Sequence, residues 1–216
     1  MANPPYKYVL FDWDGTLLNS LPSWIAATRL ALGKHNLGHL TDTVIARDIV
    51  NNLGRIHEQY PEVDSEVFRQ QVLDDDHVIN IHLSALHEGV EDTLKFLKKK
   101  HIPMGIVTTS DSDKLRNALS HHSLEQYFDI LIAHQDVVNL KPHPEPVLKA
   151  IEKLKAVTGS TLYVGDSHHD THAGRAAGVT TAIYYPTAGY YDQTFYDESG
   201  ADYILRKLDE ILVLCT

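Results

Sequence analysis

The stretch Tyr8-Val9-Leu10-Phe11-Asp12-Trp13-Asp14-Gly15-Thr16 places two carboxylates one residue apart, directly after a short apolar run that is typical of a buried strand. Residues separated by two point to the same face of an extended chain, so Asp12 and Asp14 would repel each other without a cation. Mg2+ is the expected cation. Gly15 permits a tight turn, in which Thr16 can hydrogen-bond. An ordinary Asp-rich turn explains this stretch equally well, so the assignment depends on segments further along the chain.

Length and charge bound the class of protein. The chain has 216 residues, with 19 Lys and Arg against 29 Asp and Glu, and a formal net charge of −10. The length suits one large domain or a domain with an insertion. The acidic balance has the wrong sign for a nucleic-acid-binding surface, so we expect no nucleic-acid partner. The single cysteine, Cys215, excludes an internal disulfide and a cysteine-rich metal site.

The distribution of apolar residues predicts neither a membrane-spanning helix nor a secretion signal. No apolar run approaches the roughly 18 residues that a bilayer-spanning helix needs. Residues 1–7 lack the apolar stretch of a secretion signal. We therefore expect a cytoplasmic protein without a membrane partner, either a monomer or a weak homo-oligomer.

Strand-like and helix-like stretches alternate from residue 87 onward. The expected strands are Ile102–Thr108, Ile130–Ala133, Thr161–Val164 and Val179–Tyr184, and the expected helices lie near 89–100, 111–120, 144–155 and 170–177. This rhythm predicts an α/β fold with a Rossmann-like parallel sheet and helices on both faces. Tyr8–Phe11 adds a central strand, because its acidic end should lie where the carboxyl ends of the other strands converge.

The rhythm breaks between residues 19 and 86, which read as helices only. Thr41 suits a helix cap, as does Asp64 or Ser65 before the next apolar-periodic stretch. An all-helical insert directly after the first strand looks like a lid beside an active site. We predict a catalytic core of residues 1–18 and 87–216 and an inserted helical cap domain of residues 19–86.

A second segment with candidate functional side chains lies at the end of the strand that begins at Ile102. Consecutive hydroxyls at Thr108, Thr109 and Ser110 lead into a helix that we expect Ser110 or Ser112 to cap. Hydroxyls and free amides at such a junction form an anion site. Thr108 would donate its hydroxyl to a phosphoryl oxygen, and the backbone N–H of Thr109 would add a second bond. Helix capping alone explains these residues equally well.

The third and fourth segments carry a lysine and further acids. Prolines around Lys141 would deliver its ammonium at a defined angle, to pair with carboxylates and hold a phosphoryl group, although most lysines lie on the surface. Another apolar strand ends in Gly165-Asp166, with Asp170 shortly after. Acids at a second strand end suggest that both sets surround one ion. Asp166 is the better candidate for direct metal ligation, and Asp170 for a contact through water or another residue.

The ordered set Asp12-Trp-Asp-Gly-Thr16, Thr108, Lys141-Pro142 and Gly165–Asp170 resembles the four motifs of the haloacid dehalogenase (HAD) superfamily. The helical insert after the first motif resembles that of the phosphoglycolate phosphatase and β-phosphoglucomutase branch. The resemblance spans nearly the whole chain. It implies a Rossmann-like core with a helical cap.

The resemblance also implies roles for individual residues. Asp12 would be the nucleophile that forms an aspartyl-phosphate, and Asp14 the acid that protonates the leaving oxygen and then activates water. Mg2+ would lie between Asp12, the backbone carbonyl of Asp14, and Asp166, with Asp170 nearby. Dehalogenases of the superfamily generally lack the second Asp of the first motif, so Asp14 favours phosphate esters over halogenated acids.

We therefore expect a Mg2+-dependent phosphatase that hydrolyses a small phosphate monoester, such as phosphoglycolate or a sugar phosphate. A phosphosugar mutase and a non-catalytic binding module are the alternatives. Arg55 is the expected substrate contact of the cap, with Arg47 and His57 as rivals. His168 and His169 could line the entrance, although a surface position explains them as well.

Overall fold

The computed structural model describes residues 6–185, 194 and 197–215. Residues 1–5, on which part of the expectation about secretion rests, lie outside this set. The chain divides into two compact units, one formed by Met1–Leu18 with Leu86–Thr216 and the other by Asn19–Ala85. The chain passes between the units in two short paired strands, β2 (Leu18–Asn19) and β3 (Ala85–Leu86). Among the described residues, no helix is long and apolar enough to cross a membrane.

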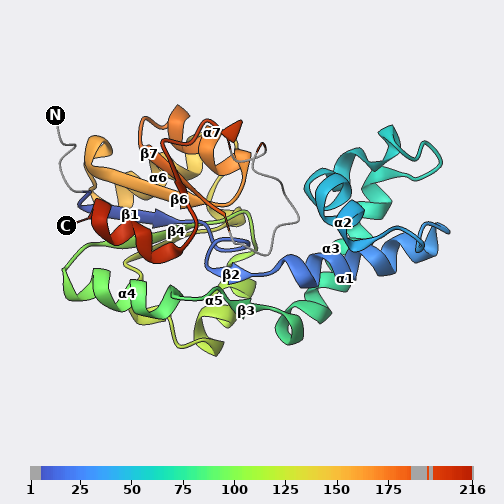
Figure 1. The fold of residues 1–216 in the computed structure, drawn as a ribbon, viewed down its shortest axis with the longest axis horizontal. Helices are drawn as coiled ribbons and strands as arrows, with labels where there is room; N and C mark the ends of the chain where they lie inside the picture. Colours follow the sequence, from blue (N-terminus) through green and yellow to red (C-terminus); the bar gives the residue numbers. More distant parts are fainter. Residues whose placement is uncertain (1–5, 186–193, 195–196, 216) are drawn as a thin grey trace. The chain divides into compact units, whose positions relative to one another are not determined.

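The larger unit is built on a six-stranded sheet in the order β5-β4-β1-β6-β7-β8, with parallel pairing between neighbours (Figure 1). Its strands are β1 (Tyr8–Phe11), β4 (Met104–Val107), β5 (Ile130–Ile132), β6 (Thr161–Gly165), β7 (Thr180–Tyr184) and β8 (Tyr203–Leu205). The predicted α/β fold is confirmed, and β1 is central. Strand β8 is absent from the prediction, because a three-residue run carries no periodicity and only pairing with β7 defines it.

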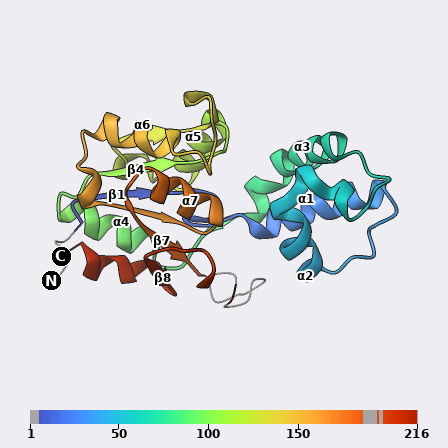
Figure 2. The ribbon, with the colours of Figure 1, turned by 90° about the horizontal axis from the view of Figure 1, so that it is seen from above.

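Helices cover both faces of this sheet, as Figures 1 and 2 show. The α-helices are α4 (Val90–Lys99), α5 (Ser112–His121), α6 (Glu145–Leu154) and α7 (His168–Ala176), and the short helices are η3 (Glu125–Tyr127), η4 (His134–Asp136), η5 (Thr158–Ser160) and η6 (Leu208–Leu214). Alternation along β1 sends Val9 and Phe11 to the core that α4, α5 and η6 cover. Leu10 points the other way, into the core that α6 and α7 cover. Asp12 follows Phe11 and continues on the Leu10 face.

The strand order places the chain's reversal at β1. The chain runs outward from β1 to β4 and β5, and then returns to β6 on the other side of β1. Phe11 is in register with Ile106 on one side and with Val164 on the other. The residues that follow these three positions therefore emerge together at one edge of the sheet. In open α/β sheets, this is where ligands bind.

The smaller unit is helical: among its described residues, those from 20 to 84 form helices and turns but no strand. Its helices are α1 (Leu21–Lys34), α2 (Asp42–Val44), the π-helix η1 (Ile45–Ile49), the 3-10 helix η2 (Val50–Glu58) and α3 (Ser65–Leu83). Helices α1 and α3 pack together through buried residues such as Leu32 and Phe68. The predicted cap Thr41 accepts a bond from the Val44 amide, and Asp64, rather than Ser65, caps α3.

Candidate active site

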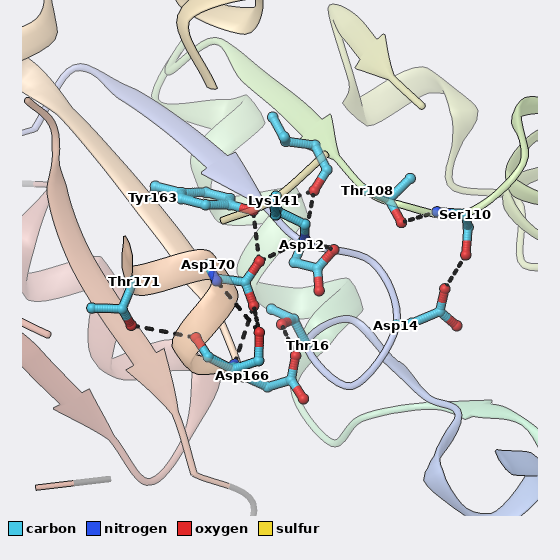
Figure 3. A network of polar contacts seen from close by, with 12 residues as sticks. Asp12, Asp14, Thr16, Thr108, Ser110, Lys141, Tyr163, Asp166, Asp170 and Thr171 are labelled. Carbon is cyan, nitrogen blue, oxygen red and sulfur yellow. Dashed lines mark hydrogen bonds and ion pairs between the residues drawn. The ribbon is translucent and has the colours of Figure 1, made fainter. Parts of the chain in front are cut away.

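Three carboxylates converge at the carboxyl ends of β1 and β6 (Figure 3). Asp12 directly follows β1, Asp166 directly follows β6, and Asp170 lies in the first turn of α7. Each offers an oxygen within 4.8 Å of the others. Asp12 and Asp170 are only 6% and 2% exposed. Buried carboxylates this close together need positive charge to balance them.

Lys141 supplies part of that charge. Its Nζ lies 2.7 Å from Oδ1 of Asp12 and 2.6 Å from Oδ1 of Asp170. It also donates to the backbone carbonyl of Val107, at 3.3 Å. An ammonium group has three donors, and these three acceptors use all of them. The side chain is 4% exposed, so Lys141 is a buried member of the site and not a surface lysine.

Two glycines allow the acids to approach the backbone so closely. Gly15 has a φ of +84°, and a Cβ on it would lie 2.2 Å from Oδ2 of Asp166. A Cβ on Gly165 would lie 2.2 Å from the Cβ of Asp170. Thr16 is fully buried and donates its hydroxyl to Oδ1 of Asp166, at 3.3 Å. Gly15 therefore serves the site twice, through its left-handed backbone and through its missing side chain.

Hydrogen bonds distinguish Asp170 from the other two acids. Its Oδ1 accepts from Nζ of Lys141 and from the Tyr163 hydroxyl, at 2.6 and 2.8 Å. Its Oδ2 accepts from the backbone N–H and the hydroxyl of Ser167, at 3.1 and 2.6 Å. A carboxylate has about four lone-pair positions, so these donors saturate Asp170.

Asp12 and Asp166 keep free acceptor positions. Among the described residues, Asp12 accepts side-chain donation only from Lys141, and Asp166 only from Thr16, in each case on Oδ1. Oδ2 of each residue is therefore available. Asp12 and Asp166 could hold a divalent cation directly, while Asp170 orients Lys141.

The pKa directions support a site that lacks positive charge. Burial, and then the charge of Asp170, raise the pKa of Asp12 to about 7 in spite of Lys141. Burial, followed by the charges of Asp170 and Asp12, also raises the pKa of Asp166 well above its usual value. Burial opposes the charged forms of Asp170 and Lys141 too. The charges of Asp12 and then Asp170 nevertheless raise the pKa of Lys141, and Lys141 with the hydrogen bonds from Ser167 and Tyr163 lowers the pKa of Asp170. One lysine does not balance three acids, and the oxygen-only donor set fits a hard cation such as Mg2+.

Asp14 lies apart from this cluster. Its Oδ2 accepts a hydrogen bond from the Ser110 hydroxyl at 2.5 Å, and Figure 3 shows its carboxylate directed away from Asp12. Its Oδ1 is buried and has no hydrogen-bond partner among the described residues. The expectation that the two acids share a face is wrong, because β1 ends at Phe11 and strand alternation stops there. Trp13 points into the core, as predicted.

The hydroxyl segment after β4 supplies donors on the other side of the site. Thr108 is 3% exposed, and its Oγ1 accepts the backbone N–H of Ser110 at 3.1 Å. The Thr108 hydroxyl proton has no acceptor among the described residues and remains available to a ligand. Thr109 follows as an exposed residue.

The expected cap of α5 is wrong. Asp111, and neither Ser110 nor Ser112, accepts the backbone N–H groups of the first turn, those of Asp113 and Lys114. Asp111 is a good capping residue that the sequence interpretation passed over in favour of the serines. The Ser110 hydroxyl is consequently left to bind Asp14.

Two members of the site are missing from the sequence prediction as functional residues. Ser110 was considered only as a cap, and Tyr163 only as part of an apolar strand. The one sequence signal for Tyr163 is a hydroxyl-bearing residue within a run that is otherwise buried and mostly apolar. Burial raises the pKa of its phenol well above the usual value, so the group acts as a neutral donor.

The candidate substrate residue of the insert lies in the smaller unit. Arg55 is exposed and pairs with Glu58, Nε to Oε1, at 2.8 Å. Its rivals are engaged locally as well: Arg47 pairs with Asp48, and the His57 ring lies 2.7 Å from the Ser65 hydroxyl.

A parallel α/β sheet whose central strands end in buried acids around one lysine defines a Rossmann-like enzyme that acts on an anionic group. The model of the haloacid dehalogenase-like hydrolase family matches residues 9–184, and the chain belongs to this family. It is therefore a hydrolase, and the predicted family membership is confirmed.

Relatives extend this result along the chain. Pyrophosphatase PpaX of Bacillus mycoides (strain KBAB4) is 32% identical over 210 residues, which are 94% of each chain. The crystal structure of a haloacid dehalogenase-like hydrolase from Bacteroides fragilis superposes on this chain with a TM-score of 0.83 and 31% sequence identity. The match covers 95% of this chain and 99% of the other. A structure from Haemophilus somnus, described as a predicted phosphoglycolate phosphatase, has a TM-score of 0.80 at 25% identity, covering 98% of both chains.

Proposed function

We propose that this protein is a Mg2+-dependent phosphatase that hydrolyses a small phosphate substrate through an aspartyl-phosphate on Asp12. One observation carries the proposal. Asp12 is a buried carboxylate at the end of the central strand, with one oxygen bound to Lys141 and the other free of donors among the described residues. A carboxylate that is oriented on one side and unoccupied on the other is suited to nucleophilic attack.

The metal would be held by Asp12 and Asp166, together with the backbone carbonyl of Asp14. Both carboxylates have an available oxygen, and burial followed by the charge of neighbouring acids raises the pKa of each, so a bound cation would favour their ionised forms. When bound, Mg2+ offsets the negative charge of the phosphoryl group. Asp170 would support the site through Lys141 instead of binding the ion.

The protein's own residues account for the remaining chemistry. The Asp12 carboxylate attacks phosphorus in line with the leaving oxygen, and the phosphorus–oxygen bond to the leaving group breaks. Asp14 gives that oxygen its proton, and then takes a proton from the water that attacks the aspartyl-phosphate. The attack releases phosphate and restores the Asp12 carboxylate. The Thr108 hydroxyl and the Thr109 amide donate hydrogen bonds to the phosphoryl oxygens, and Lys141 attracts these oxygens through its positive charge.

Inorganic pyrophosphate and phosphoglycolate are the first substrates to consider. Relatives with about 30% identity over most of the chain are named pyrophosphatase PpaX, and one structural neighbour is described as a predicted phosphoglycolate phosphatase. Sugar phosphates complete the set. The net charge of −10 disfavours polyanionic macromolecules relative to small metabolites, which fits a cytoplasmic enzyme without a nucleic-acid partner.

The helical unit would act as a cap that excludes water and selects the substrate. We place Arg55 in the substrate contact, because a guanidinium group suits the second anionic group of either candidate substrate. In this proposal Arg55 leaves its ion pair with Glu58 and pairs with the substrate instead. Its guanidinium group keeps its positive charge.

Phosphate release from a panel of these phosphate compounds, with and without Mg2+, tests the proposal. The native protein is compared with Asp12→Asn and with a control, Asp92→Asn, in which an exposed acid of α4 is changed. We expect Mg2+-dependent release that Asp12→Asn abolishes and Asp92→Asn preserves. Equal release by native protein and Asp12→Asn would contradict the nucleophile.

Product analysis separates the alternatives. Conversion of a hexose 1-phosphate to an isomer, without free phosphate, would replace the phosphatase with a phosphosugar mutase. Binding of the esters without any turnover would favour a non-catalytic module.

A further inference from the structure

We propose that Tyr163 is a positioning residue for this active site: acting through Asp170, its phenol holds Lys141 against the nucleophile Asp12. The inference rests on the proposed function for its kinetic consequence. The placement of Lys141 is a separate, measurable property.

The phenol and the ammonium share their acceptors. The Tyr163 hydroxyl lies 2.8 Å from Oδ1 of Asp170, the same oxygen that Nζ of Lys141 reaches at 2.6 Å. Both groups also lie 3.3 Å from the carbonyl oxygen of Val107. The phenol has one proton, and the shorter contact indicates that it is donated to Asp170. A continuous chain of contacts therefore runs from Tyr163 through Asp170 and Lys141 to Asp12 (Figure 3).

Asp170 is gripped from two sides. Ser167 holds Oδ2 with two donors, while Tyr163 and Lys141 share Oδ1. Without the phenol, Lys141 would be the only donor to Oδ1, and the carboxylate could tilt with the lysine. With the phenol, Oδ1 is tied to strand β6, so Lys141 meets an acceptor whose position the sheet determines.

The ring itself is well fixed. Tyr163 is 1% exposed and packs in the apolar core beneath α6 and α7. A Cβ on Gly174 of α7 would lie 3.1 Å from the Tyr163 ring, so the helix backbone lies directly against it. An aromatic ring enclosed in this way is a rigid support for a hydrogen bond.

Packing alone does not explain a tyrosine here. Phenylalanine would fill the same apolar space without a polar atom to satisfy, and a buried hydroxyl is tolerated only when it is hydrogen-bonded. The phenol's closest polar contact is a carboxylate of the active site. Removal of a group that orients a catalytic or metal-binding residue typically lowers activity or metal affinity about 10- to 100-fold.

Tyr163→Phe tests the inference, with Tyr6→Phe as the matched control. Tyr6 is also buried, at 4% exposed, and lies at the opposite end of β1 with its ring edge-on to Tyr203. We expect Tyr163→Phe to lower kcat for phosphate release about 10- to 100-fold, with KM changed less than about threefold. Tyr6→Phe should keep the native kcat even if it lowers the melting temperature as much as Tyr163→Phe does. Native kcat in Tyr163→Phe would overturn the inference.

A spectroscopic measurement makes the result independent of turnover. The 15N-labelled ammonium signal of Lys141, assigned by its loss in Lys141→Met, should be slow to exchange in the native protein and in Tyr6→Phe. We expect Tyr163→Phe to shift or broaden it. An unchanged signal would overturn the inference. If the native protein released no phosphate from any ester, the proposed function would fail, and this signal alone would decide the role of Tyr163.

Discussion

Lys141 and Asp170 form a buried ion pair, with 2.6 Å between Nζ and Oδ1 and side chains that are 4% and 2% exposed. The same ammonium group binds Asp12, so one lysine connects the candidate nucleophile to helix α7. Charge balance and catalytic geometry thus depend on one side chain.

Lys141→Met should lower both activity and stability. The substitution leaves the buried Asp12 and Asp170 without their cation, and breaking a buried pair from one side costs about 3–5 kcal/mol. Urea unfolding at pH 7 in EDTA should show this loss. Addition of Mg2+ should restore part of it. A loss below about 1 kcal/mol would mean that the acids do not depend on Lys141.

Mg2+ should stabilise the native protein through Asp166 more than through Asp170. Of these two acids, only Asp166 keeps an oxygen free of donors among the described residues, while the acceptor positions of Asp170 are occupied. A ligand that binds only the folded state, at a concentration of 100 times its Kd, adds about 2.7 kcal/mol to the free energy of unfolding. Thermal unfolding against Mg2+ concentration should show a shift that Asp166→Asn removes and Asp170→Asn retains in part. The reverse order would identify Asp170 as the metal ligand.

Ser110→Ala should impair the acid and base step. The Ser110 hydroxyl donates to Asp14, and hydrogen bonds to charged groups contribute about 1.5–3 kcal/mol, which corresponds to roughly tenfold or more in kcat. Ser112→Ala, two residues on, should leave kcat unchanged. Esters with a good leaving group, such as 4-nitrophenyl phosphate, should be less affected, because they need less protonation. An equal loss on all esters would contradict a role through Asp14.

His87 should make stability depend on pH. Burial lowers its pKa to about 4 although the side chain hydrogen-bonds to the Gly15 backbone, and its ring lies edge-on to Tyr184. In the unfolded chain His87 binds a proton below about pH 6.5, whereas in the folded protein it binds one only below about pH 4. The free energy of unfolding therefore decreases as the pH falls through this window. The full effect is about 3.4 kcal/mol, from about 2.5 pKa units at 1.36 kcal/mol each. Urea unfolding of His87→Phe between pH 4 and 7 should lack this slope, and His39→Gln, at an exposed site, should keep it.

Arg55→Ala should raise KM without unfolding the cap. Arg55 is exposed and forms an ion pair with the exposed Glu58, so the fold loses little when the pair is removed. Loss of a charged hydrogen bond to substrate predicts a roughly tenfold increase in KM. Arg69→Ala, which breaks a comparable pair with Glu66, is the control. Equal KM values in both variants would remove Arg55 from the substrate contact.

The fold class followed from local patterns. The apolar runs at Tyr8–Phe11 and Thr161–Val164, the turn residues behind them and the helical periodicity between them predicted a parallel sheet with β1 at its centre. Strand-end motifs also predicted that Asp12, Lys141 and Asp166 belong together. These inferences succeed because parallel strands end at the same edge of a sheet, whatever the details of their loops.

Sequence by itself thus determined that Asp12, Lys141 and Asp166 reach the site, whereas the tertiary structure added Ser110 and Tyr163 and decided what each residue contacts there. Asp14 turns to Ser110 because β1 has already ended, and strand alternation says nothing about a loop. Asp170 is saturated because Tyr163, Ser167 and Lys141 meet on it from a strand, a helix cap and a loop. Hydrogen bonds act over about 3 Å and depend on angle, so such assignments arise only when distant segments are packed together.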